Sequence, residues 1–294
     1  MPAAVRLSGP RARVLRTQLD ELAATYAAGP DPIDFVHRYT TADDQEVAAL
    51  LASSLAFGRV ASFTPVLESI FALSETEGGP ASWVDRCAEV GDPRLQSLFY
   101  RWVRGPDLER FASTIGRFRA RHGTIAQWIG RRLPEQGASF GRLLGALIDE
   151  LRTLSVVSTE GSFRQLSRGY RYLLPHPSSG SACKRWCMAA RWMCRTSHPD
   201  LGLWPLDPRA LVIPLDTHIH RVARMIGLTR RNDGSWRTAV EITANLRRID
   251  PDDPTRFDFV LAHLGIDGQC RGKRVIDICS QCALVPVCKT GRSG

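Results

Sequence analysis

Hydrophobic residues recur along most of this chain at intervals of three and four positions, which is the spacing of one face of an α-helix. The spacing predicts helices over residues 11–28, 43–57, 65–73, 108–118 and 140–154. Alternating hydrophobic and polar positions, the mark of a half-buried strand, are almost absent. The expected fold class is therefore mainly α.

Glycine and proline clusters separate these helical patterns. The run Gly29-Pro30-Asp31-Pro32 ends the first of them, and a proline- and serine-rich stretch precedes residue 181. We expect four segments in chain order: an N-terminal helical segment 1–40, a helical core with an inserted region 41–180, a region 181–265, and a C-terminal loop 266–294.

The sequence around Asp216 changes from an extended run to an amphipathic helix. Pro214 disfavours helix just before it, and Asp216 or Thr217 can accept hydrogen bonds from the first free amides of the helix that follows. The apolar residues of that helix have helical spacing: Ile219, Val222, Ala223 and Ile226. Exposed N–H groups and the helix dipole favour a charged carboxylate at this entry. The plainer interpretation is a helix cap that contributes about 1 kcal/mol.

Composition adds a strong positive charge and no membrane signal. The 294 residues are 44% hydrophobic and carry a net charge of +9, which suits a polyanionic partner. Arginine supplies most of it, because the only lysines are Lys184, Lys273 and Lys289. No stretch has the length of a signal peptide core or a membrane span. We therefore expect a cytoplasmic protein, nucleoid-associated when bound to DNA, that avoids membranes and acts as a monomer.

Four of the eight cysteines fall within nineteen residues near the C-terminal end. Cys270, Cys279, Cys282 and Cys288 have the spacing C-x8-C-x2-C-x5-C, in a segment with too few apolar residues to fold by itself. Thiolates that surround a metal would order such a segment. The spacing leaves open whether that metal is zinc or an iron–sulfur cluster.

Three other cysteines share one face of a helix predicted over residues 181–194. Cysteine is among the most buried residue types, and no fourth donor is spaced to join Cys183, Cys187 and Cys194. We expect these three in the core.

Residues 161–181 interleave aromatic and basic side chains. They include Phe163, Arg164, Arg168, Tyr170, Arg171 and Tyr172. Such interleaving can provide base stacking and phosphate contacts on a nucleic acid, and a half-buried helix followed by a loop explains it equally well.

The sequence Leu215-Asp216-Thr217-His218-Ile219-His220-Arg221-Val222, taken with the four-cysteine ending, resembles the helix-hairpin-helix DNA glycosylase superfamily in its endonuclease III and MutY branch. The likeness is closest to a bacterial family of uncharacterised relatives of those enzymes. It implies a two-lobed helical fold with a hairpin in region 181–265 and a [4Fe-4S] cluster, or alternatively zinc, in the C-terminal loop.

The resemblance also assigns residues to roles. It makes Asp216 the catalytic carboxylate, places Lys184 where bifunctional members keep a Schiff-base lysine, and makes the four C-terminal cysteines the cluster ligands. The residues expected to contact DNA are Gly180, Ser181, Arg185, His218, Arg221, Arg224, Arg271, Lys273 and Arg274.

This chain departs from the family's pattern at several places. Ala182 replaces the second hairpin glycine, residues 196–213 resemble an inserted loop, and the first cysteine gap is x8 rather than x6. In place of a wedge glutamine, an apolar side chain near residues 55–57 would have to fill the gap in the duplex.

The expected function is hydrolysis of the N-glycosidic bond of a damaged or mispaired base in double-stranded DNA. Asp216 would stabilise the sugar cation or activate water, with strand cleavage added if Lys184 forms a Schiff base. One alternative is a catalytically inactive nucleic-acid-binding module that retains the glycosylase frame. A zinc-stabilised RNA-binding protein is a third interpretation.

Overall fold

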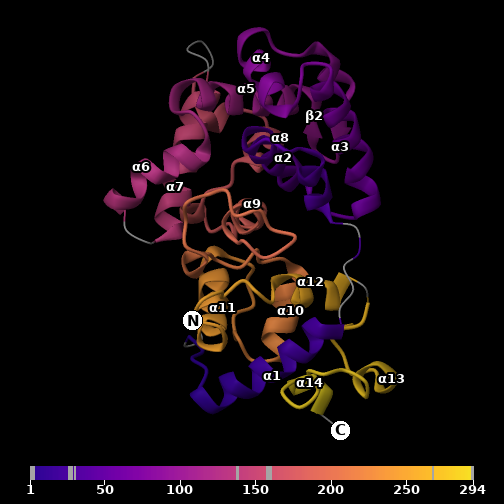
Figure 1. Ribbon diagram of the computed structural model, residues 1–294. Helices are drawn as coiled ribbons and strands as arrows, with labels where there is room; N and C mark the ends of the chain where they lie inside the picture. Colours follow the sequence, from indigo (N-terminus) through magenta and orange to yellow (C-terminus); the bar gives the residue numbers. More distant parts are fainter. Residues whose placement is uncertain are drawn as a thin grey trace. The chain divides into compact units, whose positions relative to one another are not determined.

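The structure, a computed structural model, describes residues 4–25, 29, 31–136, 139–156, 161–266 and 268–292. Helices dominate this part of the chain (Figure 1), which confirms the expected mainly α class. The chain forms two compact units. Unit 1 comprises Met1–Gly29, Gly180–Cys187 and Pro208–Gly294, and unit 2 comprises Pro30–Ser179 and Met188–Asp207.

This division differs from the four consecutive segments that the sequence suggests. The N-terminal and C-terminal parts of the chain fold together in unit 1, so segments 1–40 and 266–294 are not separate bodies. Helix α9 (Lys184–Cys194) contributes its first residues to unit 1 and its remaining residues to unit 2.

Unit 1 contains the N-terminal helix and helices from the C-terminal part of the chain. They are α1 (Gly9–Thr25), α10 (Thr217–Met225), α11 (Trp236–Ile249), α12 (Asp258–Ile266), α13 (Ile276–Cys279) and α14 (Lys289–Arg292), with a 3₁₀ turn η5 (Pro208–Ala210). Leu15 and Leu19 of α1 are completely buried, and α1 contacts α11 and α12. The Asn245 side chain joins the ends of the chain, because it accepts the Leu7 N–H and donates to the Val5 carbonyl.

Unit 2 holds the remaining helices and two short strands. These elements are η1 (Pro32–Arg38), α2 (Ala42–Leu55), α3 (Val60–Glu75), α4 (Pro80–Val90), η2 (Pro93–Ser97), β1 (Phe99–Tyr100), β2 (Val103–Arg104), α5 (Gly105–His122), α6 (Ile125–Gln136), α7 (Phe140–Ser155), η3 (Phe163–Gln165), α8 (Arg168–Leu173) and η4 (Pro177–Ser179). Helix α2 is buried from Glu46 to its end and forms the centre of the unit.

A buried carboxylate connects the central helix of unit 2 to its neighbours. Glu46 is 3% exposed and accepts the N–H groups of Ile125 and Ala126, at the start of α6, at 2.7 and 2.9 Å. The indole N–H of Trp204 donates to the same carboxylate at 2.7 Å. Burial raises the pKa of Glu46, and these three donors oppose that shift. The carboxylate therefore caps α6 from inside the core.

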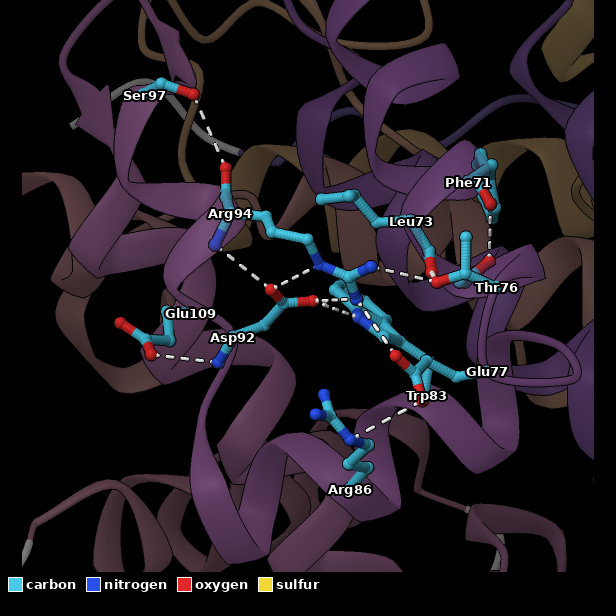
Figure 2. Close-up of polar contacts among 11 residues, drawn as sticks. Phe71, Leu73, Thr76, Glu77, Trp83, Arg86, Asp92, Arg94, Ser97 and Glu109 are labelled. Atoms are coloured by element: carbon cyan, nitrogen blue, oxygen red, sulfur yellow. Dashed lines mark hydrogen bonds and ion pairs between the residues drawn. The ribbon is translucent and has the colours of Figure 1, made fainter.

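Helices α4 and α5 lie against each other at close range. A Cβ atom on Gly116 of α5 would overlap the Val84 carbonyl oxygen of α4, so this contact requires glycine. Next to it, Figure 2 shows the Asp92 carboxylate bound by the Arg94 guanidinium at 2.7 and 2.8 Å and by the Trp83 indole N–H at 2.9 Å. Arg94 also forms an ion pair with Glu77, just after the end of α3, so one network of charged side chains connects three helices.

The observed helices follow the predicted ones with small changes at their ends. The predictions over 43–57, 65–73, 108–118, 140–154 and 181–194 correspond to α2, α3, α5, α7 and α9. Of the prediction over 11–28, residues 26–28 lie outside the described residues. The β1–β2 hairpin was not predicted, since two-residue strands are too short for an alternating pattern.

None of the helices in the described part of the chain combines the length and the hydrophobicity that a membrane span requires.

The Asp92 network predicts a pH-dependent stability. The Arg94 guanidinium lowers the pKa of Asp92 from 3.8 to about 2, so its stabilisation is complete above about pH 4 and is lost as the pH falls through about 2. Asp92→Asn should lower the free energy of unfolding at pH 7 by about 2 kcal/mol, because it removes a fully buried charge partner. Urea denaturation at pH 7 and pH 3 measures both effects, and the variant should lose less stability on acidification than the wild type.

Arg86→Ala is the matched control within the same network. Arg86 pairs with Glu77 at 3.5 Å and is 46% exposed, so its loss should cost less than about 1 kcal/mol. If Asp92→Asn is as stable as the wild type at pH 7, or equally sensitive to acid, the network does not carry this stability.

Candidate functional site

Asp216 lies at the junction that the sequence predicts. It is the N-cap of α10, with extended backbone angles (φ −117°, ψ −174°). Its Oδ1 atom accepts the N–H groups of His218 and Ile219 at 2.9 and 2.8 Å. The hydrophobic run of residues 211–215 before it is buried and places the cap. The predicted change from extended chain to helix is confirmed.

The second carboxylate oxygen of Asp216 faces a lysine from a distant part of the sequence. The Nζ atom of Lys184 lies 3.3 Å from Asp216 Oδ2. The Asp216 side chain is 13% exposed and the Lys184 side chain 33%, so both remain partly accessible to solvent. Unit 1 therefore holds together the carboxylate and the amine that the sequence selects.

Lys184 is positioned by a turn with an unusual backbone. Gly180 has φ +83°, a conformation that favours glycine, and its carbonyl accepts the Trp236 N–H of α11 at 3.2 Å. Ser181 pairs with Ser235 through a β-bridge. Cys183 also has positive φ, at +51°, and α9 begins one residue later. Pairing with α11 thus fixes the start of α9, which carries Lys184.

Two residues expected to contact DNA point inward instead. Arg185 is 6% exposed, so its guanidinium is not on the surface where a phosphate would meet it. The Arg221 guanidinium donates to the Cys270 carbonyl oxygen at 2.8 Å and contacts His218 at 3.4 Å. The burial of Arg185 argues against its assignment as a DNA contact, and Arg221, which is half-buried, connects α10 to the cysteine loop.

Two glycines make room for the Arg221 side chain. A Cβ atom on Gly265 would lie 2.8 Å from Arg221 Nη2, and one on Gly272 would lie 2.6 Å from Arg221 Cδ. Gly265 would also meet the His218 ring, which is half-buried at this place. These close approaches show that Arg221 forms a tightly packed contact, here called the Arg221 joint. The pattern of charged residues in the sequence gives no sign of this role.

The other expected contact residues are accessible. Gly180 is exposed, Ser181 is half-buried, and four basic side chains are exposed: Arg224, Arg271, Lys273 and Arg274. Unit 1 contains 20 basic and 11 acidic residues, whereas unit 2 contains 19 of each. The whole net charge of +9 therefore belongs to the unit that holds Asp216.

The four cysteines of the C-terminal loop are neighbours. Burial raises the pKa of the Cys282 thiol, and the nearby Cys270, Cys288 and Cys279 thiols raise it further. The Cys288 sulfur accepts the Gly291 N–H at 3.2 Å. Among the described residues, no group of three or more His, Cys, Asp or Glu side chains is arranged to hold a metal ion. Four thiols are the donor set of a thiolate metal site, and these four would have to move closer together to hold a metal.

The cysteines in α9 and just before it lie in the core, as predicted. Cys183, Cys187 and Cys194 are at most 4% exposed. Burial raises the pKa of Cys187 and of Cys194 well above that of a free thiol, so neither forms a thiolate readily.

The Arg221 joint predicts a local effect on the cysteine loop. Arg221→Ala removes a charged hydrogen bond to the Cys270 carbonyl and leaves a gap beside Gly265 and Gly272. Amide hydrogen exchange at residues 270–272 should accelerate about 10- to 100-fold, which corresponds to the loss of one charge-assisted bond.

Arg224→Ala is the matched control, since Arg224 lies three residues further along α10 and is exposed. Its exchange pattern should equal that of the wild type. Equal exchange in the Arg221 variant would mean that the loop is held by other contacts.

Comparison with known proteins identifies one family. The family model described as "Protein of unknown function (DUF2400)" matches residues 31–267, which is most of the chain. No curated protein and no solved structure matches the chain. The match covers α2 to α12, including both Lys184 and Asp216. The chain therefore belongs to the DUF2400 family.

Proposed function

We propose that this protein is a DNA N-glycosylase that removes a damaged or mispaired base from double-stranded DNA. The observation that carries the proposal is the 3.3 Å approach of Lys184 Nζ to Asp216 Oδ2 at the start of α10. The resemblance to helix-hairpin-helix glycosylases singles out this pair, and the two residues come from separate stretches of unit 1.

Asp216 would act on the sugar. As the bond between the base nitrogen and C1′ breaks, its electron pair leaves with the base and positive charge develops on the deoxyribose. A carboxylate held by two backbone N–H groups does not need to reorganise to stabilise that charge. Asp216 would then accept a proton from the attacking water as the oxygen–C1′ bond forms.

Lys184 would have one of two roles. As a neutral amine it would attack C1′ in place of water, forming a nitrogen–C1′ bond, and its released proton would go to Asp216 or to solvent. As an ammonium group it would only position the Asp216 carboxylate. Among the described residues, Lys184 is the lysine that pairs with Asp216, whereas Lys273 and Lys289 belong to the cysteine segment.

Charge supports a polyanionic substrate for the same unit. The excess of nine positive charges lies in unit 1, where Arg224, Arg271, Lys273 and Arg274 are exposed. Phosphate contacts from such residues provide affinity without sequence preference, and flipping of the base would provide selectivity.

We also propose that Cys270, Cys279, Cys282 and Cys288 hold a [4Fe-4S] cluster, with zinc as the alternative. The bound group would serve to cross-link a loop that contains few buried apolar residues, Leu284 and Val287 among them. Arg221 would then transmit the position of this loop to α10, because it binds the Cys270 carbonyl.

The catalytic role predicts a large effect of Asp216→Asn on activity and a small effect on folding. Asparagine caps helices about as well as aspartate, so the melting temperature should change little. The rate of base release from lesion-bearing oligonucleotides should fall by a factor of about 100 or more. A glycosylase screen over uracil, oxidised, deaminated and alkylated bases supplies the substrate for this comparison.

Asp233→Asn provides the matched control. Asp233 also accepts hydrogen bonds near a helix start, from the Ser235 N–H and the Thr238 hydroxyl, but it pairs with Arg231 and not with Lys184. Its variant should retain the wild-type rate. An unchanged rate in Asp216→Asn removes Asp216 from the chemistry, and DNA binding with no base release across the screen would favour the inactive binding module.

The role of Lys184 is tested by trapping. If Lys184 attacks C1′, borohydride should convert the intermediate into a stable protein–DNA adduct that Lys184→Ala cannot form. Absence of an adduct on a processed substrate would make Lys184 a positioning residue, and Lys273→Ala is the control for nonspecific trapping.

The cysteine site predicts a metal with a spectroscopic signature. Anaerobically purified protein should be brown, absorb near about 400 nm and contain about four iron atoms per chain. Cys282→Ser should lose most of this iron, whereas Cys194→Ser, a variant of a core cysteine, should retain it. Stoichiometric zinc without colour would establish the alternative metal, and neither metal would remove the proposal.

A further inference from the structure

The β1–β2 hairpin of unit 2 has a turn that its sequence does not favour. Phe99 pairs with Arg104 and Tyr100 with Val103, so Arg101 and Trp102 are the two turn residues. Two-residue turns of this kind favour asparagine and glycine, because they require positive φ. Arg101 adopts φ +55° nevertheless. A bulky residue held in this strained conformation suggests that its side chain has a role beyond closing the turn.

The turn completes a cluster of four aromatic rings, here called the hairpin cluster. It comprises Phe57, Tyr100, Trp102 and Tyr172. The Phe57 ring stacks on Trp102 at 5.4 Å and meets Tyr172 edge-on at 5.0 Å, and Trp102 meets Tyr172 edge-on at 5.0 Å. Tyr100 is buried beneath, with its hydroxyl bonded to the Phe57 carbonyl, whereas the other three rings are half-buried. Part of each of these three rings therefore remains at the surface.

Arginines border the hairpin cluster. The Arg101 guanidinium lies 5.9 Å from the Phe57 ring centre and 6.0 Å from that of Trp102, and Arg168 lies 5.8 Å from Trp102. Next to them, Arg104 lies 5.6 Å from the exposed Phe99 ring. These distances lie near the outer limit of cation–π contacts, about 6 Å, so each guanidinium lies beside the aromatic rings.

The bordering arginines have no acidic partner among the described residues. Within the described ranges, Arg101, Arg104 and Arg168 form no ion pair, and all three are exposed. Some other arginines of the unit do pair with carboxylates, as Arg38 does with Glu68 and Arg119 with Asp85. A neutral unit thus has a local concentration of positive charge around exposed aromatic rings.

The indole N–H of Trp102 indicates that packing alone does not explain a tryptophan at this position. Its Nε1 atom is buried and finds no hydrogen-bond acceptor among the described residues. A phenylalanine would fill the place without leaving a buried donor unpaired. The larger flat surface of tryptophan offsets this cost if another planar group stacks on the cluster.

We propose that the hairpin cluster binds unpaired nucleotides of a single-stranded nucleic acid. Bases stack against the exposed surfaces of Phe57, Trp102 and Tyr172, and the phosphates pair with Arg101, Arg104 and Arg168. Neither a lipid headgroup nor a phosphorylated peptide provides a series of planar groups for three neighbouring rings. The proposal concerns unit 2 and does not depend on chemistry at Asp216.

The test measures binding of fluorescent oligothymidylate and oligouridylate, and of a duplex of equal length, to the full-length protein by anisotropy. Trp102→Ala should weaken binding of the single strands about 5- to 100-fold, the effect of losing one stacked base, and should alter duplex binding less. Trp102→Phe, which retains a ring, should remain within about threefold of the wild type. The two oligonucleotides distinguish DNA from RNA as the preferred strand.

Arg101→Gly separates binding from folding. Glycine adopts positive φ without strain, so the melting temperature should stay the same or rise while single-strand affinity falls. Arg132→Ala is the matched control, because Arg132 lies 4.5 Å from the Trp128 ring in α6, outside the cluster, and should bind as the wild type does.

Equal affinity of Trp102→Ala and wild type for single strands would overturn the proposal. So would binding of anionic phosphatidylserine vesicles or phosphopeptides, but not oligonucleotides, that depends on Trp102. Because these measurements follow binding and not base release, their failure leaves the proposed glycosylase activity unaffected, and loss of activity in Asp216→Asn leaves this site unaffected.

Discussion

The placement of one carboxylate at the start of α10 is the constraint on which unit 1 depends. Asp216 divides its two oxygens between the helix amides and the Lys184 ammonium group, so a single side chain both begins a helix and attracts a residue from another part of the chain. The same helix, one turn later, uses Arg221 to hold the Cys270 carbonyl. The short helix α10 therefore connects the candidate reactive pair to the cysteine loop, because both are held by residues of this helix.

Much of the fold follows from local patterns. The helices α2, α5 and α7 correspond to strong apolar periodicity, and Asp216 was recognisable as a cap because proline and an apolar run precede it. The division into units was not predictable in this way. It depends on contacts such as those of Asn245 with Leu7 and Val5, between residues almost the whole chain apart, and sequence periodicity contains no information about such pairs. The hairpin was missed because its strands contain two residues each.

The candidate site was only partly predictable for the same reason. Residue type and resemblance pointed to Lys184 and Asp216, although the sequence alone does not establish that they meet. The sequence was less informative about the arginines. It does not distinguish Arg185, which is buried, from Arg221, which binds the cysteine loop, or from Arg224, which is exposed. The signal that distinguishes Arg221 lies in Gly265 and Gly272, whose missing side chains leave space for it.

Charge and aromatic surface are distributed differently in the two units, and this bears on how a nucleic acid would be recognised. Unit 1 has a surplus of nine positive charges, which attract phosphates at long range and with little selectivity. Unit 2 is neutral overall, so its attraction must be local, and the hairpin cluster is one place where exposed arginines border aromatic rings. Stacking acts only on bases that have left the duplex, whereas phosphate contacts act on any strand. A protein that combines the two would bind paired DNA broadly through unit 1 and would respond to unpaired nucleotides through unit 2, which is the distinction that a search for disrupted base pairs requires.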